Sequence, residues 1–356
     1  MSSLVKMQGI NKSFAGVAAL RSAGLDVKPG EVHALIGQNG AGKSTFIKIL
    51  TGVYRRDEGS VQFDGQDIHI SSPREAQHIG IATIYQELNL VPQRSVTENV
   101  TLGYEPRRKS GLVDWPKAHR RTREILTRFG VDIDVKAPLG SYSTAIQQLV
   151  AIARAVSLDA KLVIMDEATS SLDATEVKTL FDVVRALRDS GVTVLYISHF
   201  MDELFAVCDR VTIMRDGQTV GTRSIPDTSK LELIADMLGR NMGDIEAAGV
   251  TELGGGQKQV GELLFAAKAI STGNRLPHLN MTIHRGEIVG LGGLLGSGRT
   301  EAARAIFGVD AVTAGAMTYK GKDFLPSNPQ EAIKAGIAML SEDRKLEGIV
   351  PDMSVR

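Results

Sequence analysis

Residues 37 to 45 read G-Q-N-G-A-G-K-S-T, and this stretch decides the fold class. It fits the pattern G-x-x-x-x-G-K-[ST] at every fixed position, between a strand-like apolar run at 32–36 and a helix-like run at 46–50. Glycines in such a loop let successive backbone N–H groups and a helix N-terminus converge on a phosphate group. The stretch therefore predicts a P-loop in an α/β nucleotide-binding fold.

Separate residues of this loop are given separate roles. Lys43 is expected to reach the β- and γ-phosphates of ATP, and the Ser44 hydroxyl is expected to ligate Mg²⁺. Upstream, Phe14 is a candidate to stack on adenine, with core packing as its alternative. The candidate nucleotide-binding residues of the loop are Gly37, Gln38, Asn39, Gly40, Ala41, Gly42, Lys43, Ser44 and Thr45.

Composition bounds the class of protein. A chain of 356 residues, 43% hydrophobic and 23% charged, is typical of a soluble globular protein of two domains. No apolar run approaches the roughly 18 residues of a membrane span, and a signal peptide is not evident, so membrane association is expected through a partner. Zero formal net charge argues against bulk attraction to nucleic acid. The single cysteine, Cys208, excludes a disulfide framework, fits the cytosol and is expected to be a buried apolar residue.

The chain contains an internal repeat at an offset of 256 residues. Lys43 aligns with Arg299, which lies 256 positions later (299 − 43 = 256), and Gly30-Glu31 recurs at the same offset as Gly286-Glu287. We therefore expect two homologous domains, over 1–240 and 261–356, joined by a glycine-rich linker over 241–260. Because the second copy ends inside an element of the first, we expect the chain to be C-terminally truncated. The same offset carries Gly37, Gly40, Gly42, Gly52, Gly59, Gly65 and Gly80 onto Gly293, Gly296, Gly298, Gly308, Gly315, Gly321 and Gly336.

Two acidic residues and a histidine follow further strand-like runs. The run at 162–165 leads into Asp166-Glu167, which has the form of a Walker B strand. Asp166 is expected to hold Mg²⁺ through water, and Glu167 to polarise the attacking water as general base; a solvated turn is the alternative. His199 follows the run at 193–197, where a γ-phosphate contact is expected, with a structural histidine as its alternative.

A glutamine completes the predicted catalytic set. Gln86 follows the apolar run I-A-T-I-Y and is assigned a contact to Mg²⁺ and water that senses the γ-phosphate. Residues 171–173, Ser-Leu-Asp, are expected to form a D-loop-like turn after the Asp-Glu pair. The catalytic candidates are thus Glu167 and His199, and the metal-ligand candidates are Ser44, Gln86 and Asp166.

These motifs, in this order, resemble the nucleotide-binding subunits of ABC transporters. Four sequence segments narrow the resemblance to the double-cassette ATPases of bacterial simple-sugar importers. They are 38–54, 84–90 (I-Y-Q-E-L-N-L), 95–100 (S-V-T-E-N-V) and 293–300 (G-L-L-G-S-G-R-T). The resemblance covers nearly the whole chain. It implies an α/β P-loop ATPase core with a helical subdomain over about 88–157, and a second, incomplete copy of that core.

The resemblance also implies partners and a location. A groove near Gln86 to Asn99 would receive a coupling helix from a membrane permease, and a periplasmic sugar-binding protein would belong to the same complex. ATP and Mg²⁺ would be bound at the cytoplasmic face of the inner membrane, without nucleic acid. The sugar is not readable, although Y-S-T-A-I-Q-Q at 142–148 and Phe200-Met201-Asp202 favour the galactofuranose type.

The chain departs from the family pattern in the signature loop, which usually reads L-S-G-G-Q. Ser143 is retained as a candidate γ-phosphate contact, but side chains at Thr144 and Ala145 would hold the backbone further from phosphate. In the family this loop faces the second copy's P-loop, where Arg299 replaces lysine and is no conservative substitute. Glu342 stands where Gln86 stands in the first copy.

The second copy also has no aromatic residue near 270–274 to match Phe14. All of these departures from the family pattern fall on one composite site, so that site is expected to be degenerate. The competent site would need a second signature loop beyond Arg356, so the chain alone is expected to bind ATP without efficient hydrolysis.

Two other functions stay open at this point. A soluble tandem-ABC translation or repair factor usually keeps two intact P-loops and a long charged linker, unlike this chain. A non-transporting remnant would only bind ATP. The basic stretch at 107–123 is interpreted as a solvated helical face or a contact with the permease or lipid headgroups, rather than with nucleic acid.

Overall fold

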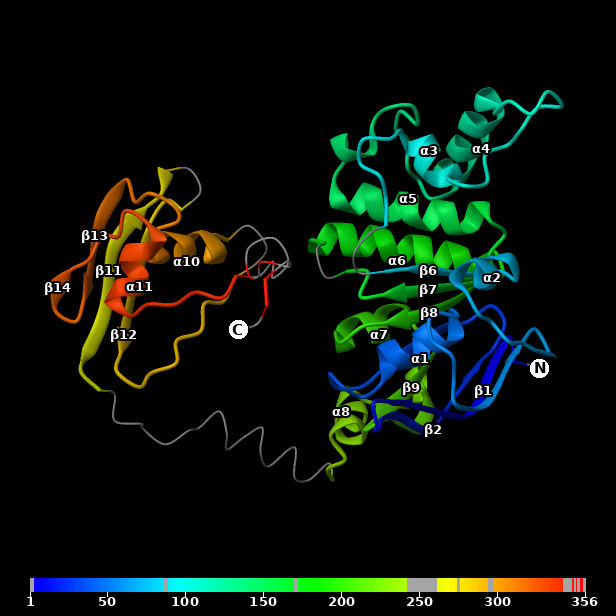
Figure 1. The fold of residues 1–356 in the computed structure, drawn as a ribbon, viewed down its shortest axis with the longest axis horizontal. Coiled ribbons are helices and arrows are strands. Elements are labelled where there is room, and N and C mark those ends of the chain that lie inside the picture. The colour runs from blue at the N-terminus through cyan, green and yellow to red at the C-terminus, as the bar shows by residue number, and fades with distance from the viewer. Residues whose placement is uncertain are drawn as a thin grey trace. The chain divides into compact units, whose positions relative to one another are not determined.

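The computed structural model describes residues 3–85, 89–169, 172–241, 261–273, 276–293 and 297–341, together with 348, 350, 353 and 354. The chain folds into two compact units, Met1–Val250 and Thr251–Arg356 (Figure 1). The expected linker lies outside the described residues from position 242 onward. No helix within the described ranges is long and apolar enough to cross a membrane.

The first unit combines two sheets with helices. Its strands are β1 (Val5–Phe14), β2 (Val17–Val27), β3 (Val32–Ile36), β4 (Glu58–Phe63), β5 (Gln66–Asp67), β6 (Ile81–Ile84), β7 (Leu162–Asp166), β8 (Thr193–Ile197), β9 (Arg210–Arg215) and β10 (Gln218–Ser224). Its helices are α1 (Lys43–Leu50), α2 (Pro73–His78), α3 (Val96–Thr101), α4 (Trp115–Arg128), α5 (Thr144–Ser157), α6 (Ala174–Asp189), α7 (Met201–Val207) and α8 (Lys230–Leu238), with short 3₁₀ turns at Leu139–Ser141 and Ile225–Asp227.

A six-stranded sheet forms the centre of the first unit, in the order β10-β9-β3-β8-β7-β6. All neighbours pair in parallel except β10, which is antiparallel to β9. Side chains alternate along each inner strand: Val163 and Met165 of β7 enter one core cluster, whereas Leu162 and Ile164 enter the other. Because both faces are covered, these strands are mostly apolar, as the runs at 162–165 and 193–197 predicted.

The two faces are covered differently. Helices α5, α6 and α7 pack on one face, and α1 lies on the other, between the parallel sheet and a second sheet (Figure 1). That second sheet is antiparallel in the order β2-β1-β4-β5. Phe46 and Leu50 of α1 are fully buried between the sheets. The predicted α/β P-loop fold class is therefore confirmed.

The expected helical subdomain contains α3, α4 and α5, which contact one another. The helices begin at polar caps. Ser95 and Glu98 form a capping box at α3, and Ser143 accepts a hydrogen bond from the backbone N–H of Ile146 at the start of α5. Asp173, which the sequence assigned to a D-loop-like turn, caps α6 through the N–H groups of two residues in its first turn.

The second unit repeats the smaller sheet. It contains β11 (Leu263–Ser271), β12 (Leu279–His284), α10 (Arg299–Phe307), β13 (Ala314–Tyr319), β14 (Lys322–Asp323) and α11 (Pro329–Ala335). Its sheet runs β12-β11-β13-β14, which matches the order β2-β1-β4-β5 of the first unit. Both β13 and β14 occupy positions 256 residues after β4 and β5, and α10 and α11 begin 256 residues after α1 and α2.

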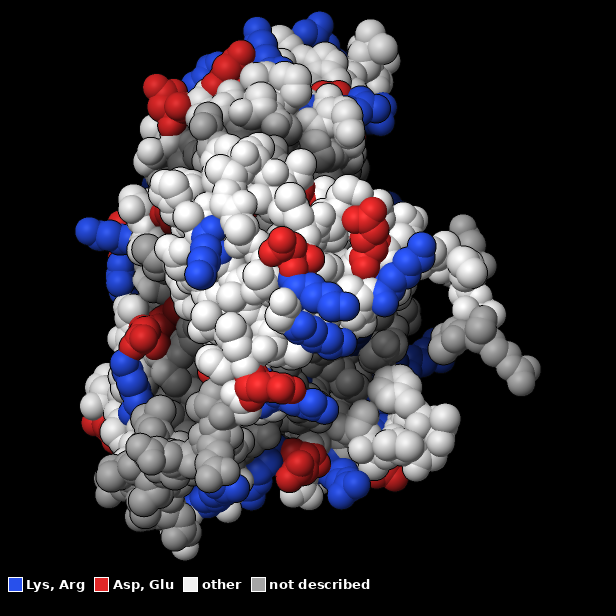
Figure 2. Space-filling view, turned by 90° about the vertical axis from the view of Figure 1, so that its left-hand side faces the viewer, with Lys and Arg blue, Asp and Glu red and all other residues white. Residues whose placement is uncertain are grey.

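The repeat extends to single hydrogen bonds. Glu31 accepts from the Lys28 N–H at 2.8 Å, and Glu287 accepts from the His284 N–H at 2.7 Å, again 256 positions on. Residues 288–292 are the counterparts of β3 at the 256-residue offset, but they form neither helix nor strand, and Ile288 is 96% exposed. The visible face in Figure 2 shows Lys, Arg, Asp and Glu side chains interspersed, as the zero net charge suggests.

Candidate nucleotide-binding site

The predicted P-loop joins β3 to α1, the arrangement that its sequence required. The helix begins at Lys43, three residues earlier than the apolar run alone indicated. Gly42 precedes it with φ +99°, a left-handed conformation that favours glycine. Gly37 approaches the backbone of β9 so closely that a Cβ there would lie 2.3 Å from the Met214 carbonyl oxygen. Two of the motif's glycines are therefore required by geometry.

The Lys43 ammonium lies over this loop. Its Nζ donates to the carbonyl oxygens of Gly37 at 2.7 Å and Gln38 at 3.2 Å. Burial lowers the pKa of Lys43, while the nearby carboxylates of Glu167 and Asp166 act to raise it. A half-buried cation held above a loop of backbone N–H groups is suited to polyphosphate binding.

The acidic pair lies at the carboxyl end of β7. Burial, and secondarily the Glu167 charge, raises the pKa of Asp166, with Lys43 and Lys48 acting in the opposite direction. Glu167 has φ +50°, unusual for a residue with a side chain, and its N–H donates to the Ile197 carbonyl of β8 at 2.9 Å. Such backbone strain is concentrated at functional sites.

His199 lies directly against the candidate base. Its Nδ1 is 3.2 Å from Oε1 of Glu167. Because a carboxylate only accepts hydrogen bonds, Nδ1 is the donor. The imidazole also packs against the Phe200 ring, with the centroids 4.0 Å apart. The two catalytic candidates, 32 positions apart in sequence, are thus brought into contact.

A cleft of about 630 Å³ collects most of the predicted site. Six predicted residues besides Asp166 and Glu167 line it: Asn39, Gly40, Gly42, Lys43, Ser44 and Thr45. Arg21, Asp216 and Gly217 also line it, although no motif in the sequence indicated them.

The missed residues belong to β2 and to the β9–β10 turn. Asp216 and Gly217 both have positive φ, as the Asp-Gly pair of a tight hairpin requires. The Gly217 N–H donates to the Ala41 carbonyl at 3.1 Å, and the Arg21 N–H donates to the Gly217 carbonyl at 2.8 Å. The Asp-Gly pair signals a turn, but only the pairing of β9 with β3 brings that turn to the P-loop.

Seven predicted residues are not among those that line the cleft: Gly37, Ala41 and His199, whose contacts are given above, and the four that follow. The Phe14 ring packs edge-on against Tyr54 at 5.1 Å between centroids, and Phe14 does not line the cleft. Gln38 Nε2 donates to the Met237 carbonyl near the end of α8, at 3.4 Å. Ser143 caps α5 and does not line this cleft. Gln86, like Ser171, Gly296 and Glu342, lies outside the described residues.

The donor set of the cleft fits Mg²⁺. The Ser44 hydroxyl and the Asp166 carboxylate line the same cleft, and oxygen atoms are the ligands that Mg²⁺ prefers. Burial, and then the Glu167 charge, raise the pKa of Asp166, and Lys43 and Lys48 offset this only in part, so a bound cation would stabilise the Asp166 carboxylate. No cluster of three or more His, Cys, Asp and Glu ligands occurs within the described ranges, so any Mg²⁺ here would share its coordination with phosphate and water.

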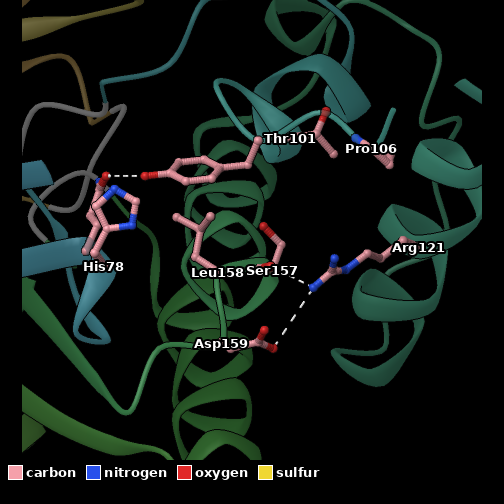
Figure 3. A pocket seen from close by; sticks show the side chains of 9 residues that line it. His78, Thr101, Pro106, Arg121, Ser157, Leu158 and Asp159 are labelled. Carbon is pink, nitrogen blue, oxygen red and sulfur yellow. Dashed lines mark hydrogen bonds and ion pairs between the residues drawn. The ribbon is translucent and has the colours of Figure 1, made fainter. Parts of the chain in front are cut away.

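A second cleft, of about 260 Å³, lies between the sheet side of the unit and the helical subdomain (Figure 3). Gln77 and His78 of α2 form one wall, and Tyr104 contacts both, through a 3.4 Å hydrogen bond to Gln77 and an edge-on ring contact to His78. On the other wall, Arg121 donates to the Ser157 carbonyl at 2.7 Å and lies 4.0 Å from the Asp159 carboxylate. Its remaining lining residues are Thr101, Pro106 and Leu158.

Comparison with known families agrees with this geometry. The family model described as "ABC transporter" matches residues 20–170 and 276–356. The chain belongs to the ABC transporter family. The first matched segment contains the P-loop and the Asp166-Glu167 pair, and the second contains the Arg299 counterpart of Lys43.

Relatives within this ABC family are similar over almost the whole chain. The fructose import ATP-binding protein FruK of Bifidobacterium longum is 44% identical over 358 residues, covering 99% of this chain and 69% of that protein. The ribose import ATP-binding protein RbsA 1 of Rubrobacter xylanophilus is 44% identical over 355 residues, with coverage of 100% and 69%. The RbsA protein of Bacillus licheniformis is 40% identical over 352 residues, with coverage of 99% and 70%.

Solved structures of ABC cassettes share the fold. An ATP-binding cassette of an ABC transporter in its ADP conformation is 25% identical, with a TM-score of 0.59 over 69% of this chain and 99% of that one. A nucleotide-free ATP-binding cassette from an ABC transporter is also 25% identical, with a TM-score of 0.57 over 72% of this chain and all of the other.

Proposed function

We propose that this chain is the ATP-binding subunit of a monosaccharide importer and couples ATP hydrolysis to transport through a membrane permease. One observation carries the catalytic part: Lys43, Asp166 and Glu167 line one cleft, with His199 in contact with Glu167. The names of the relatives as fructose and ribose import ATP-binding proteins support the transport part. Such a subunit would lie at the cytoplasmic face of the membrane.

Each residue of the cleft then has a task. The backbone of the P-loop and the Lys43 ammonium bind the phosphates, while Ser44 and Asp166 would hold Mg²⁺. A bound Mg²⁺ would supply charge neutralisation at the phosphates. Glu167 accepts a proton from the attacking water, and the Nδ1–H of His199 fixes the orientation of the Glu167 carboxylate.

We infer that the second unit is a degenerate cassette. The shared strand order and the 256-residue offset support the repeat. Arg299 begins α10 behind a left-handed Gly298, just as Lys43 begins α1 behind Gly42.

The groove of Figure 3 is our candidate for the permease contact. It joins α2, which leads into β6 and Gln86, to the end of α5, whose N-terminus carries Ser143. An inserted permease helix would therefore contact elements that lead to two predicted phosphate-contacting residues, Gln86 and Ser143. No residue of the predicted stretch Gln86 to Asn99 lines this groove, although Thr101, two positions beyond the stretch, does.

Sugar uptake tests the transport function directly. The full importer, assembled from this chain with its permease and sugar-binding protein, is reconstituted in vesicles containing ATP. Uptake of radiolabelled ribose, galactose, fructose and galactofuranose is then measured. We expect ATP-dependent uptake of at least one of them; ATP binding without any transport would instead support the remnant alternative.

A pair of substitutions tests the asymmetry of the two P-loops. We expect Lys43→Ala to weaken Mg²⁺–ATP binding at least about 100-fold, since it removes a charge that contacts two phosphates. Arg299→Ala should change the affinity less than about threefold. Isothermal titration of both variants and the parent chain measures this difference, and equal losses would contradict the assignment.

A further inference from the structure

One surface of the first unit concentrates positive charge. Residues 107–128 contain eight Lys or Arg and two Asp or Glu, which leaves 33 basic and 39 acidic residues in the rest of the chain. All eight basic side chains belong to exposed residues. Six of them form what we call the basic surface: Arg107, Arg108, Lys109, Lys117, Arg120 and Arg123. Arg121 is not included, because it lines the groove of Figure 3, nor is Arg128, which lies at the far end of α4 from the hairpin.

Half of the basic surface lies on a preformed hairpin between α3 and α4. Arg107 and Val113 form an antiparallel bridge, and the Arg108 N–H donates to the Leu112 carbonyl at 2.8 Å. The Gly111 N–H donates back to the Arg108 carbonyl at 2.9 Å, with φ +84° at Gly111. The hairpin projects beyond α4 at the end of the helical subdomain (Figure 1). Since its backbone is already ordered, docking it would cost little conformational entropy.

Large apolar side chains accompany these cations. Leu112 on the hairpin is 69% exposed, and Trp115 at the start of α4 is 39% exposed. The Trp115 ring stacks on His119, with 6.0 Å between centroids, and is thereby held in one orientation. Lys117, Arg120 and Arg123 follow at intervals of three, so they share the outer face of α4.

We propose that the basic surface binds anionic lipid headgroups, with Leu112 and Trp115 entering the interface of the bilayer. Lys and Arg near an anionic leaflet are attracted to it, and Trp is favoured at the boundary between headgroups and acyl chains. A nucleic acid would use the cations, but an exposed leucine gains nothing from a phosphodiester backbone. The basic surface adjoins Pro106 and Arg121, which line the proposed permease groove. A permease bound in that groove would bring the bilayer close to the basic surface, so this inference rests on the proposed function.

The only tryptophan of the chain makes the test direct, because intrinsic tryptophan fluorescence reports on Trp115 alone. The chain is titrated with vesicles of phosphatidylcholine alone and with vesicles that also contain about 30 mol% phosphatidylglycerol, an anionic lipid. We expect a blue shift, and quenching by brominated acyl chains, only with the anionic vesicles. Binding should weaken strongly between about 0.1 and 0.5 M salt.

Matched variants separate this surface from general electrostatics. The triple variant Arg107→Gln, Arg108→Gln, Lys109→Gln should reduce partitioning about tenfold or more. The triple variant Lys28→Gln, Arg55→Gln, Lys178→Gln removes the same charge from exposed positions elsewhere and should change it less than twofold. Leu112→Ser should reduce the blue shift while leaving the salt dependence in place. ATP titration of each variant confirms that it is folded.

Several results would overturn the proposal. These are equal binding to neutral vesicles, equal losses for the two triple variants, or a fluorescence change with single-stranded oligonucleotides but none with vesicles. Failure of the proposed transport function would appear separately, as absent sugar uptake by the assembled importer while vesicle binding persists.

Discussion

At the scale of single residues, the site combines strain with unfavourable charge. Glu167 has a left-handed backbone, and Asp166 carries a pKa raised by burial and by the Glu167 charge. Neither feature stabilises the nucleotide-free fold. Both features place carboxylates where phosphate and a cation would be bound. Strained backbone and buried charge of this kind are usually found at functional sites.

Glu167→Gln tests the role of general base. The amide retains the size of the side chain but cannot take a proton, so ATP hydrolysis by the assembled importer should fall at least about 100-fold. ATP affinity should change little, because Lys43 and the P-loop are untouched. Phosphate release under steady-state conditions measures the first effect, and nucleotide titration measures the second. Hydrolysis within a few-fold of the parent rate would remove Glu167 from the mechanism.

The surroundings of Phe14 could not be predicted from the residue alone, and its stacking on adenine stays a prediction. Its aromatic character and its place before the P-loop favoured adenine stacking, with core packing as the alternative. In the structure its ring contacts Tyr54, and the Lys12 ammonium lies 5.4 Å from its centroid. Tyr54 follows α1, so this contact depends on how β1 and α1 are packed together and not on any local sequence pattern.

At the scale of elements, local signals predicted the strands and the loop of the core well. The runs at 32–36 and 193–197 coincide with β3 and β8, because strands buried on both faces consist mostly of apolar residues. The contribution of Arg21 and Asp216 could not be predicted in the same way. It requires β9 to pair beside β3 although the two strands are separated by more than 170 positions in the sequence.

Helix α5 connects two regions of the proposed mechanism. Its N-cap is Ser143, and further along Arg154 donates to the Asn89 carbonyl at 2.9 Å. Burial lowers the pKa of Arg154, so the Arg154 guanidinium is held in a desolvated place by this contact. Asn89 lies three positions after Gln86. We therefore regard Arg154 as a positioning residue that ties α5 to the segment after β6.

Replacing this residue should weaken coupling more than binding. Arg154→Gln is expected to lower permease-stimulated ATP hydrolysis about fivefold, equivalent to about 1 kcal/mol of coupling. The affinity for ATP should stay within twofold. Arg185→Gln is the control, since Arg185 also donates to a backbone carbonyl, that of Ala206 at 2.9 Å, but far from the cleft. Comparable losses in both variants would indicate a general structural effect.

At the scale of the whole molecule, the repeat places equivalent residues in opposite environments. Val32 of β3 is fully buried, whereas Ile288, 256 positions later, is 96% exposed. We expect Val32→Ser to cost about 2–4 kcal/mol, because it removes apolar burial and introduces a hydroxyl. Ile288→Ser should change the free energy of unfolding by less than about 0.5 kcal/mol. Urea unfolding of each variant measures both values, and a large cost at Ile288 would show that it is covered in solution.

The two units should also differ in resistance to protease. Clusters of 36 and 23 buried apolar residues stabilise the first unit, whereas the described part of the second contains one cluster of seven. Leu340 of the second unit is 99% exposed. Because opening of a segment requires little free energy when few buried contacts are lost, cleavage should begin in the second unit or in residues 241–260.

Limited trypsin digestion followed by mass spectrometry should therefore leave a fragment close to residues 1–240. That fragment should bind ATP in a Lys43-dependent manner, since every described residue of the cleft lies within it. If the second unit survived as long as the first, its core would have to be larger than these seven side chains indicate.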